Sequence, residues 1–255
     1  SLEFKSRNLL TYDENIKKFI TSFGFEIYVN LKDPLIGNPI SQGIVYEKNV
    51  SNTFTKYLKK DMTLLDIGAN IGWYSLLTAQ SLQDECKIYA FEPYSFNSKL
   101  ILASQSTNNF KSINLIQSAV GNKTGTVQFG ATGSNGQCQE INNDIDTILN
   151  SDIVNMIKID DIIHEKIDII KIDIEGAEYK ALIGSIKTLK ESLPIIFSEF
   201  TPTAMPSISG VGWDEYLNLM INLGYKIKII EEQLIECDKD INKVYKIFKE
   251  KEKDH

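Results

Sequence analysis

The sequence predicts an α/β fold in which a largely parallel sheet is connected by crossover helices. From about residue 60 onward, short apolar runs alternate with helix-length segments, an order typical of parallel sheets. One apolar run ends in a loop with two glycines, Gly68 and Gly72, directly before a helix. The next run ends in Glu92, at about the distance where an acid reaches ribose hydroxyls in a nucleoside-binding βαβ unit. We therefore expect a nucleoside site at the ends of these strands.

The individual elements can be predicted in order from apolar periodicity and turn residues. In the N-terminal part we expect a helix at Tyr12–Ser22 and a strand at Phe25–Val29. The further strands are expected at Thr63–Ile67, Lys87–Phe91, Ile113–Val120, Ile167–Ile172, Pro194–Phe200 and Tyr225–Ile230. The further helices are expected at Trp73–Ser81, Phe96–Ser106, Ala177–Leu189 and Trp213–Leu223. Residues 1–60 are expected to be an N-terminal extension within the same unit, and residues 61–248 the main domain.

A polar stretch interrupts this alternation between Gly121 and Asn155. It is rich in Gly, Asn, Ser and Gln, with one short strand expected at Thr126–Phe129. A long polar segment inside a compact domain is more often a functional insertion or lid than a packed element. We therefore expect this stretch to be a functional insertion or a lid.

Composition narrows the functional classes. The formal net charge of −7 argues against a general nucleic-acid binder, which would carry a basic face. Cys86, Cys138 and Cys237 are widely spaced and odd in number, so reduced thiols in a cytoplasmic protein are expected rather than disulfides or zinc. No apolar run approaches the roughly 18 residues needed to span a bilayer. Because the chain begins without Met, we expect it to be one domain of something longer.

The loop from Asp66 to Gly72 distinguishes between nucleoside cofactors. A dinucleotide fingerprint reads G-x-G-x-x-G and holds a pyrophosphate at the helix N-terminus. Here an acid precedes the first glycine, and a carboxylate at that place would repel a pyrophosphate. It suits the ammonium and sulfonium groups of S-adenosylmethionine, which carries no phosphate. The alternative is a strand-ending Asp that only caps the following turn.

A second dense cluster runs from Lys171 to Glu178. An apolar strand ends there in alternating charges, and Gly176 precedes a helix. Ligands of open α/β sheets bind outside the carboxyl ends of the strands, so this cluster is expected in the same crevice as Asp66 and Glu92. Asp173 and Glu175, as alternate residues of an extended segment, would project to one side. The alternative is that these acids only complement the helix dipole.

Together these motifs resemble the FkbM family of S-adenosylmethionine-dependent methyltransferases. The resemblance covers about residues 46–200 and rests on Asp66–Gly72, Phe91–Pro93, Ala119–Gly121, Ile159–Asp161 and Lys171–Glu178. It implies a class I methyltransferase fold of the Rossmann-like type, with a seven-stranded, mostly parallel sheet, one reversed strand and flanking helices. It also implies that S-adenosylmethionine is the cofactor and that hydroxyl groups of sugars, glycans or secondary metabolites are methylated.

The family's functional residues carry over position by position. The cofactor-binding set implied by the resemblance is Glu47, Asp66, Gly68, Asn70, Gly72, Glu92, Ser118 and Asp173. Within it Glu92 matches the ribose acid, whereas Ser118 stands where such enzymes often place an acid or amide beside the adenine. Asp173, Glu175 and Glu178 match the family's signature acids. Ser207–Trp213 also resembles FkbM domains joined to glycosyltransferase modules, which suggests a longer polypeptide.

Methyl transfer to an aliphatic hydroxyl needs a general base within hydrogen-bond reach. His164 precedes a predicted strand and should lie at the opposite end of the sheet, so the catalytic candidates are Asp173, Glu175 and Glu199. Clustered carboxylates raise one another's pKa, which suits a base that works near neutral pH. The same acids could instead hold Mg²⁺. We nevertheless assign no residue as a metal ligand.

Two other functions are compatible with parts of the sequence. One is an NAD-dependent sugar-modifying enzyme, which would need the dinucleotide glycine spacing and usually a Tyr-x-x-x-Lys pair. The glycine spacing is absent, and Tyr57–Lys60 is one residue too short for the pair. The other is a catalytically silent binding module of a larger assembly. The intact acidic cluster argues against a silent module, because crowded carboxylates are unfavourable without a function.

Overall fold

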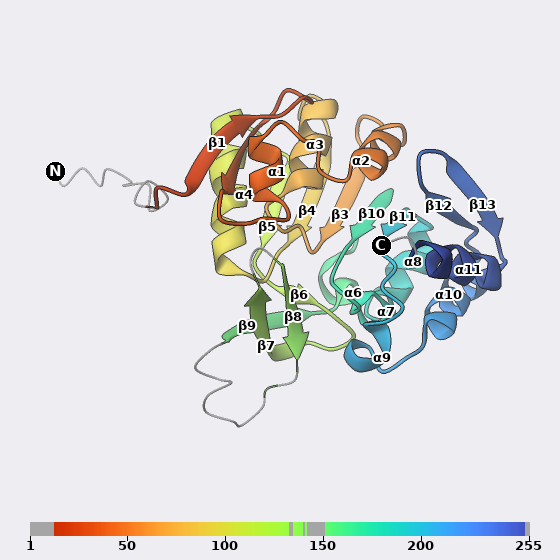
Figure 1. Ribbon diagram of the computed structural model, residues 1–255. Helices are drawn as coiled ribbons and strands as arrows, with labels where there is room; N and C mark the ends of the chain where they lie inside the picture. Colours follow the sequence, from red (N-terminus) through yellow and green to blue (C-terminus); the bar gives the residue numbers. More distant parts are fainter. Residues whose placement is uncertain (1–12, 133–134, 140, 142–150, 253–255) are drawn as a thin grey trace.

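A five-stranded sheet forms the centre of the computed structural model, which describes residues 13–132, 135–139, 141 and 151–252 (Figure 1). All neighbouring strands are parallel, in the order β11-β10-β3-β4-β5. The strands are β3 (Thr63–Ile67), β4 (Lys87–Phe91), β5 (Ile113–Ile116), β10 (Ile169–Ile172) and β11 (Ile195–Ser198). The α/β class with a parallel sheet is therefore confirmed, whereas seven strands were predicted.

Two hydrophobic cores cover the two faces of this sheet. Alternate strand residues divide between them: Leu64 and Ile88 belong to one core, and Leu65 and Ile170 to the other. The first core contains residues of α2 (Lys48–Thr55), α3 (Trp73–Ser81), α4 (Ser95–Asn108) and the N-terminal segment. The second contains residues of α7 (Glu178–Ile183), α8 (Ile186–Ser192), α10 (Trp213–Asn222) and α11 (Ile241–Lys251). The molecule is thus a three-layer arrangement with a helical layer on each face (Figure 1).

The strand order reverses between β3 and β10. From β3 the chain proceeds to β4 and β5 on one side, and then returns to β10 and β11 on the other. Crevices of open α/β sheets form at this point, beyond the carboxyl ends of the strands. The strand ends are also aligned, since Ile67 pairs with both Phe91 and Ile172, and Ile172 pairs with Ser198. The residues that follow these strands therefore lie along one edge.

The predicted helix at residues 12–22 is wrong. Ile16–Ile20 forms β1, which pairs antiparallel with β2 (Glu26–Asn30), while Tyr12 lies outside the described residues. Ile16, Phe19 and Ile20 have helical spacing, but a turn with Gly24 at a φ of 90° brings the two segments together as a hairpin. The predicted strand Phe25–Val29 corresponds to β2, and Phe25, Ile27 and Val29 are fully buried in the first core. A short helix, α1 (Gly37–Ser41), follows.

The apolar run Ile113–Val120 is divided between two sheets instead of forming one strand. Its first half is β5, and its end is β6 (Ala119–Val120), which pairs parallel with β9 (Asp152–Ile157). With β7 (Gly125–Thr132) and β8 (Asn135–Gln139) these strands form a four-stranded sheet, β6-β9-β7-β8. The polar stretch therefore contains more regular structure than the one strand predicted at Thr126–Phe129. Other parts of that stretch lie outside the described residues.

The predicted helix Ala177–Leu189 is interrupted at Gly184. A Cβ at this position would lie 2.0 Å from the carbonyl oxygen of Gly121, so the chain passes too closely there for a larger residue. A second helix starts two residues later, and its N-terminus is capped from a distance. Asp160, in α6 (Ile159–Ile162), accepts hydrogen bonds from the backbone N–H groups of Lys187 at 2.8 Å and Thr188 at 2.9 Å.

The C-terminal part explains why the main sheet has fewer strands than predicted. The run Tyr225–Ile230 does form a strand, β12 (Ile227–Ile230), but it pairs antiparallel with β13 (Leu234–Asp238). Neither strand is hydrogen-bonded to β11, so they form a separate two-stranded sheet. A short helix, α9 (Met205–Ile208), lies between β11 and α10. Within the residues that the structure describes, no helix is long and apolar enough to cross a membrane.

Candidate functional site

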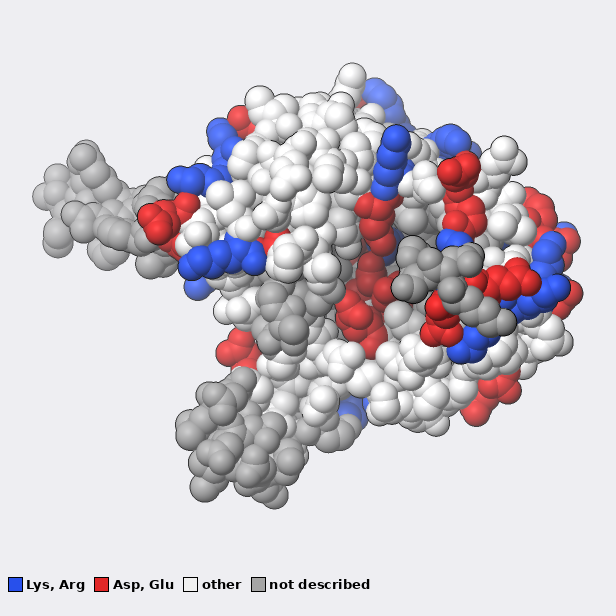
Figure 2. Space-filling model, in the orientation of Figure 1, with Lys and Arg blue, Asp and Glu red and all other residues white. Residues whose placement is uncertain are grey.

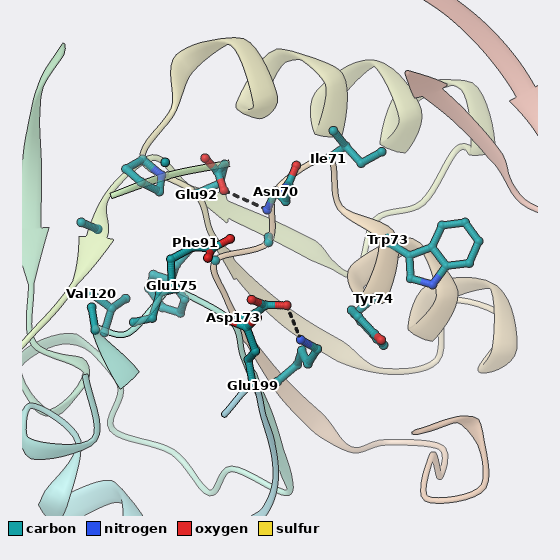
Figure 3. Close-up of a pocket in the computed structure, with 18 of the residues that line it drawn as sticks. Asn70, Ile71, Trp73, Tyr74, Phe91, Glu92, Val120, Asp173, Glu175 and Glu199 are labelled. Atoms are coloured by element: carbon teal, nitrogen blue, oxygen red, sulfur yellow. Dashed lines mark hydrogen bonds and ion pairs between the residues drawn. The ribbon is translucent and has the colours of Figure 1, made fainter. Parts of the chain in front are cut away.

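A cavity lies at the carboxyl ends of β3, β4 and β10 (Figure 3). Its lining combines the predicted glycine loop with acids that follow three strands of the sheet, namely Glu92 after β4, Asp173 after β10 and Glu199 after β11. Other predicted residues in the lining are Glu47, Gly68, Asn70, Ser118 and Glu175. Asp66 and Gly72 are outside it. The fold therefore brings most of the predicted set together, although these residues span the chain from Glu47 to Glu199.

The glycine loop is shaped by a close approach of two backbone segments. Gly68 has a φ of 78°, and a Cβ there would lie 2.0 Å from the carbonyl oxygen of Asp173. The N–H groups of Gly68 and Ala69 both donate to the carbonyl oxygen of Phe91, at 3.0 and 2.9 Å. Gly72 has a φ of 87° and begins α3 against Ile101. Glycine at residue 68 thus lets the ends of β3 and β10 meet.

Glu92 anchors the loop rather than projecting freely into solvent. Its carboxylate accepts the backbone N–H of Asn70 at 2.8 Å and that of Tyr94 at 2.9 Å (Figure 3). The side chain is buried, and burial raises its pKa to about 8 even though these hydrogen bonds act in the opposite direction. One acid therefore fixes the conformation of the loop and also borders the cavity.

Asp66 lies beneath the loop. It is buried and accepts a hydrogen bond of 2.6 Å from the Ser75 hydroxyl of α3. Burial raises its pKa to about 6, and the Ser75 hydrogen bond and nearby Lys171 counteract part of this effect. The expectation that the Asp66 carboxylate stands at the mouth of the site is therefore wrong. Asp66 and Leu64 are alternate residues of β3, so their side chains lie on the same face of the sheet, which is the face of the first core.

Lys171 is a buried cation that connects several elements around the cavity. Its ammonium lies 2.8 Å from Asp173 Oδ2, 3.9 Å from Glu47 Oε2 and 4.8 Å from the centre of the Tyr74 ring. The Tyr74 hydroxyl in turn donates to Glu47 at 2.5 Å. Burial lowers the pKa of Lys171, but Asp173 and Glu47 outweigh this effect, so the net shift is upward. Lys171 is therefore charged, and it is surrounded by its own partners.

The pKa values of three carboxyl groups in the lining are shifted in different directions. Burial tends to raise the pKa of Asp173, but Lys171 outweighs it and the net shift is downward. Glu199 hydrogen-bonds with Asp173, and burial together with the Asp173 charge raises its pKa to about 9. Burial and Asp173 also raise the pKa of Glu175. At neutral pH Asp173 is ionised and Glu199 holds a proton.

Glu178, a signature acid of the sequence, has a structural position. It is fully buried and lies outside the cavity lining, and its Oε1 accepts the backbone N–H groups of Ile174 and Gly176 at 3.0 and 3.3 Å. These bonds hold a loop in which Glu175 has a φ of 57° and Gly176 a φ of 98°. Left-handed conformations at non-glycine residues are unfavourable and concentrate at functional sites. Asn70 and Glu47, also in the lining, have φ values of 52° and 43°.

Sequence reasoning missed several residues of the lining. The sequence assigns no role to Tyr46 and Tyr74, while Phe129, Gly136 and Cys138 come from the polar stretch, on β7 and β8. Part of this stretch thus lies against the cavity, but periodicity does not identify which of its residues do so. His164 is not in the lining. Among the described residues, no group of three or more His, Cys, Asp or Glu could hold a metal ion.

Comparison with known proteins identifies the domain. The family model described as "Methyltransferase FkbM domain" matches residues 66–227, which is more than half of the chain. A search of curated proteins found no match.

The chain also aligns with parts of solved structures at low sequence identity. An FkbM methyltransferase from Methylobacillus flagellatus KT is 21% identical, with a TM-score of 0.45 over 64% of this chain and 36% of that chain. A precorrin-6y C5,15-methyltransferase from Geobacter metallireducens GS-15 is 12% identical, with a TM-score of 0.42 over 72% of this chain and 76% of that chain. A tRNA (uracil-54, C5)-methyltransferase from Pyrococcus abyssi, in complex with S-adenosyl-L-homocysteine, is 10% identical. Its TM-score is 0.41 over 77% of this chain and 37% of that chain. The match thus spans about a third of the FkbM structure's own length.

We predict that Gly68→Ala is far more harmful than Gly43→Ala. Both residues have a positive φ, 78° and 80°, so alanine is strained by about 1–2 kcal/mol at either position. Only at Gly68 does the new Cβ also collide with backbone, which adds about 1–3 kcal/mol. Urea unfolding of both variants measures the difference. Equal losses of stability would contradict the close approach of the β3 and β10 ends.

We predict that Glu199→Gln makes the stability of the ligand-free protein less dependent on pH. The raised pKa, about 9, means that the folded protein keeps a proton that the unfolded chain loses above its usual pKa. The contribution of Glu199 is thus present below about pH 4.5 and is lost as pH rises through 9. Urea unfolding between pH 6 and 8 should show a slope reduced by up to about 1.4 kcal/mol per pH unit. The exposed Glu191→Gln variant serves as control, and an unchanged slope in Glu199→Gln would contradict the prediction.

Proposed function

This chain belongs to the FkbM family of S-adenosylmethionine-dependent methyltransferases, and we propose that it methylates a hydroxyl group of a sugar, glycan or secondary metabolite. The observation that carries the proposal is the cavity beside the glycine loop, in which the pKa of Asp173 is lowered and the pKa values of Glu175 and Glu199 are raised. An aliphatic hydroxyl must lose a proton as its oxygen is methylated, and a carboxylate with a raised pKa is suited to accept it.

The cavity fits S-adenosylmethionine better than a dinucleotide. Its described lining contains one basic side chain, Lys171, which is already paired with acids, so nothing there would neutralise a pyrophosphate. The surrounding carboxylates instead complement an ammonium and a sulfonium. We assign the glycine loop and Glu92 to the nucleoside, with Ser118 beside the base. When bound, the cofactor supplies a methyl carbon on a sulfonium sulfur, which leaves as a neutral thioether.

Glu175 is the general base in this proposal. Lys171 balances the charge of Asp173 and lowers the pKa of that carboxyl, so Asp173 is a weak base. Glu199 already holds a proton. Glu175 lines the same cavity, and its pKa is raised by burial and by the Asp173 charge. A base is most effective when its pKa lies near the working pH. Asp173 and Glu199 orient the acceptor, and the proton of the hydroxyl passes to Glu175.

We also propose a compartment for this domain, a class of substrate that it excludes and a longer polypeptide to which it belongs. The three free cysteines agree with a reducing compartment such as the cytoplasm. The acidic lining disfavours a nucleic-acid substrate, whose phosphates it would repel. The resemblance of Ser207–Trp213 to domains joined to glycosyltransferase modules supports a longer polypeptide that also transfers sugars.

We predict that S-adenosylmethionine and S-adenosylhomocysteine bind, whereas NAD does not. Isothermal titration calorimetry measures the heat, and a thermal melt provides a second readout. A ligand at about 100 times its Kd stabilises the folded state by about 2.7 kcal/mol. No heat with either nucleoside would refute the proposed function. Heat with NAD instead would favour the sugar-modifying oxidoreductase, and binding without transfer to any hydroxyl would favour a silent module.

We predict that Glu175→Gln lowers kcat by about 10²- to 10⁴-fold, because general-base catalysis contributes an acceleration of this size. The substitution preserves shape and leaves the Asn70–Glu92 contact intact, so the Kd for S-adenosylmethionine should change by less than about twofold. Methyl transfer is followed by release of S-adenosylhomocysteine, and Glu191→Gln on the surface is the control. A kcat within threefold of the unmodified protein would exclude Glu175 as the base.

A further inference from the structure

We propose that the methyl acceptor is a hydroxylated amine, protonated at neutral pH and without phosphate or carboxylate groups. This inference rests on the proposed function and extends it from the reaction to the class of substrate. It follows from the charges that line the cavity, from the partners of its one described cation and from a buried oxygen of Glu199.

The charge balance of the cavity is strongly negative. Five acids line it, and Lys171 is the one basic side chain among the described lining residues. The five acids are Glu47, Glu92, Asp173, Glu175 and Glu199. Even with Glu92 and Glu199 protonated, three acids remain against one ammonium. An anionic acceptor would therefore enter a field of its own sign, whereas a cationic acceptor would be attracted into it.

Lys171 cannot serve as the anchor for an anionic substrate. It is buried, with an exposed fraction of 4%, and its ammonium is already held by Asp173, Glu47 and the face of the Tyr74 ring. A phosphate that bound it would displace a carboxylate at 2.8 Å and leave that acid without its cation. The single positive charge of the lining is therefore an internal element of the site.

The acids converge on one part of the cavity. Tyr46 lies within electrostatic reach of Glu47, Asp173, Glu175 and Glu199, so these side chains surround a common space. Figure 3 shows Asp173, Glu175 and Glu199 on one side of the cavity, apart from the Asn70–Glu92 contact at the cofactor loop. The acceptor side of the site is thus the acidic side.

One oxygen of Glu199 can accept a further hydrogen bond. Its Oε2 atom is buried and has no hydrogen-bond partner within the part of the chain that the structure describes. A buried carboxyl oxygen without a donor is unfavourable unless a ligand satisfies it. A protonated amine supplies a hydrogen bond to this oxygen, and it leaves a neighbouring hydroxyl of the same molecule for Glu175.

Acidic side chains are also visible from outside the molecule. Figure 2 shows a band of Asp and Glu side chains down the middle of the face that it draws, with basic side chains mainly towards the periphery. Such a band raises the local concentration of cations and accelerates their association.

The test compares three sugars that differ only at carbon 6: 6-amino-6-deoxyglucose, glucose and glucose 6-phosphate. Each is titrated into the full chain saturated with S-adenosylhomocysteine, so the ammonium of the cofactor product is present throughout. We expect the amine to bind at least tenfold more tightly than glucose, and the phosphate to give no measurable binding. Glu199→Leu, which removes the acceptor oxygen, should reduce the preference for the amine to less than threefold, whereas the surface variant Glu191→Leu should keep it.

Two results would overturn the inference. One is a phosphate sugar that binds as tightly as the amine, and the other is an amine that binds no better than glucose, including the absence of binding by all three. Neither result affects the proposed function, which depends on the calorimetric response to S-adenosylmethionine and on methyl transfer to any hydroxyl acceptor. Transfer to a neutral acceptor without a preference for amines would leave the function standing and remove only the substrate class.

Discussion

The buried ion pair between Lys171 and Asp173 is the interaction on which the site depends. It lies at the point where β10 ends beside β3, with 2.8 Å between the two charges. It makes Asp173 the ionised member of its pair with Glu199, and it leaves Glu199 protonated. Through Glu47 and Tyr74 it also connects the segment before α2 to the cavity. Removing one partner of such a pair leaves an uncompensated buried charge, which is strongly destabilising.

Much of the central sheet could be predicted from the sequence because its strands are buried on both faces. Thr63–Ile67 and Lys87–Phe91 have the predicted bounds, since short apolar runs between turns have few other solutions. The segments that failed depend on distant partners. Ile16–Ile20 has helical spacing but pairs with β2, and Ile113–Val120 reads as one strand although its end pairs with β9. Local pattern does not contain this information.

The candidate site shows the same division. The glycine loop, Glu92, Asp173 and Glu199 could be found because each follows a strand, and the ends of parallel strands share an edge. What each acid does could not be found, because it depends on burial and partners. Asp66 turned out to be covered by Ser75, and Glu178 binds backbone N–H groups. Lys171 forms an ion pair with Asp173 and thereby lowers the pKa of that acid, which no local pattern indicates.

The division of residues 113–120 between two sheets has an evolutionary consequence. Because β5 and β6 are parts of one run, the four-stranded sheet is attached at the edge of the cavity without adding any strand to the main sheet. Phe129 and Cys138 form a wall there, while the cofactor loop is built entirely from other elements. This wall lies beside Glu92, since the Phe129 ring is 5.7 Å from the ring of Tyr94 and Cys138 is within electrostatic reach of Glu92. During evolution, this one insertion can therefore change the wall of the cavity without any change in the main sheet.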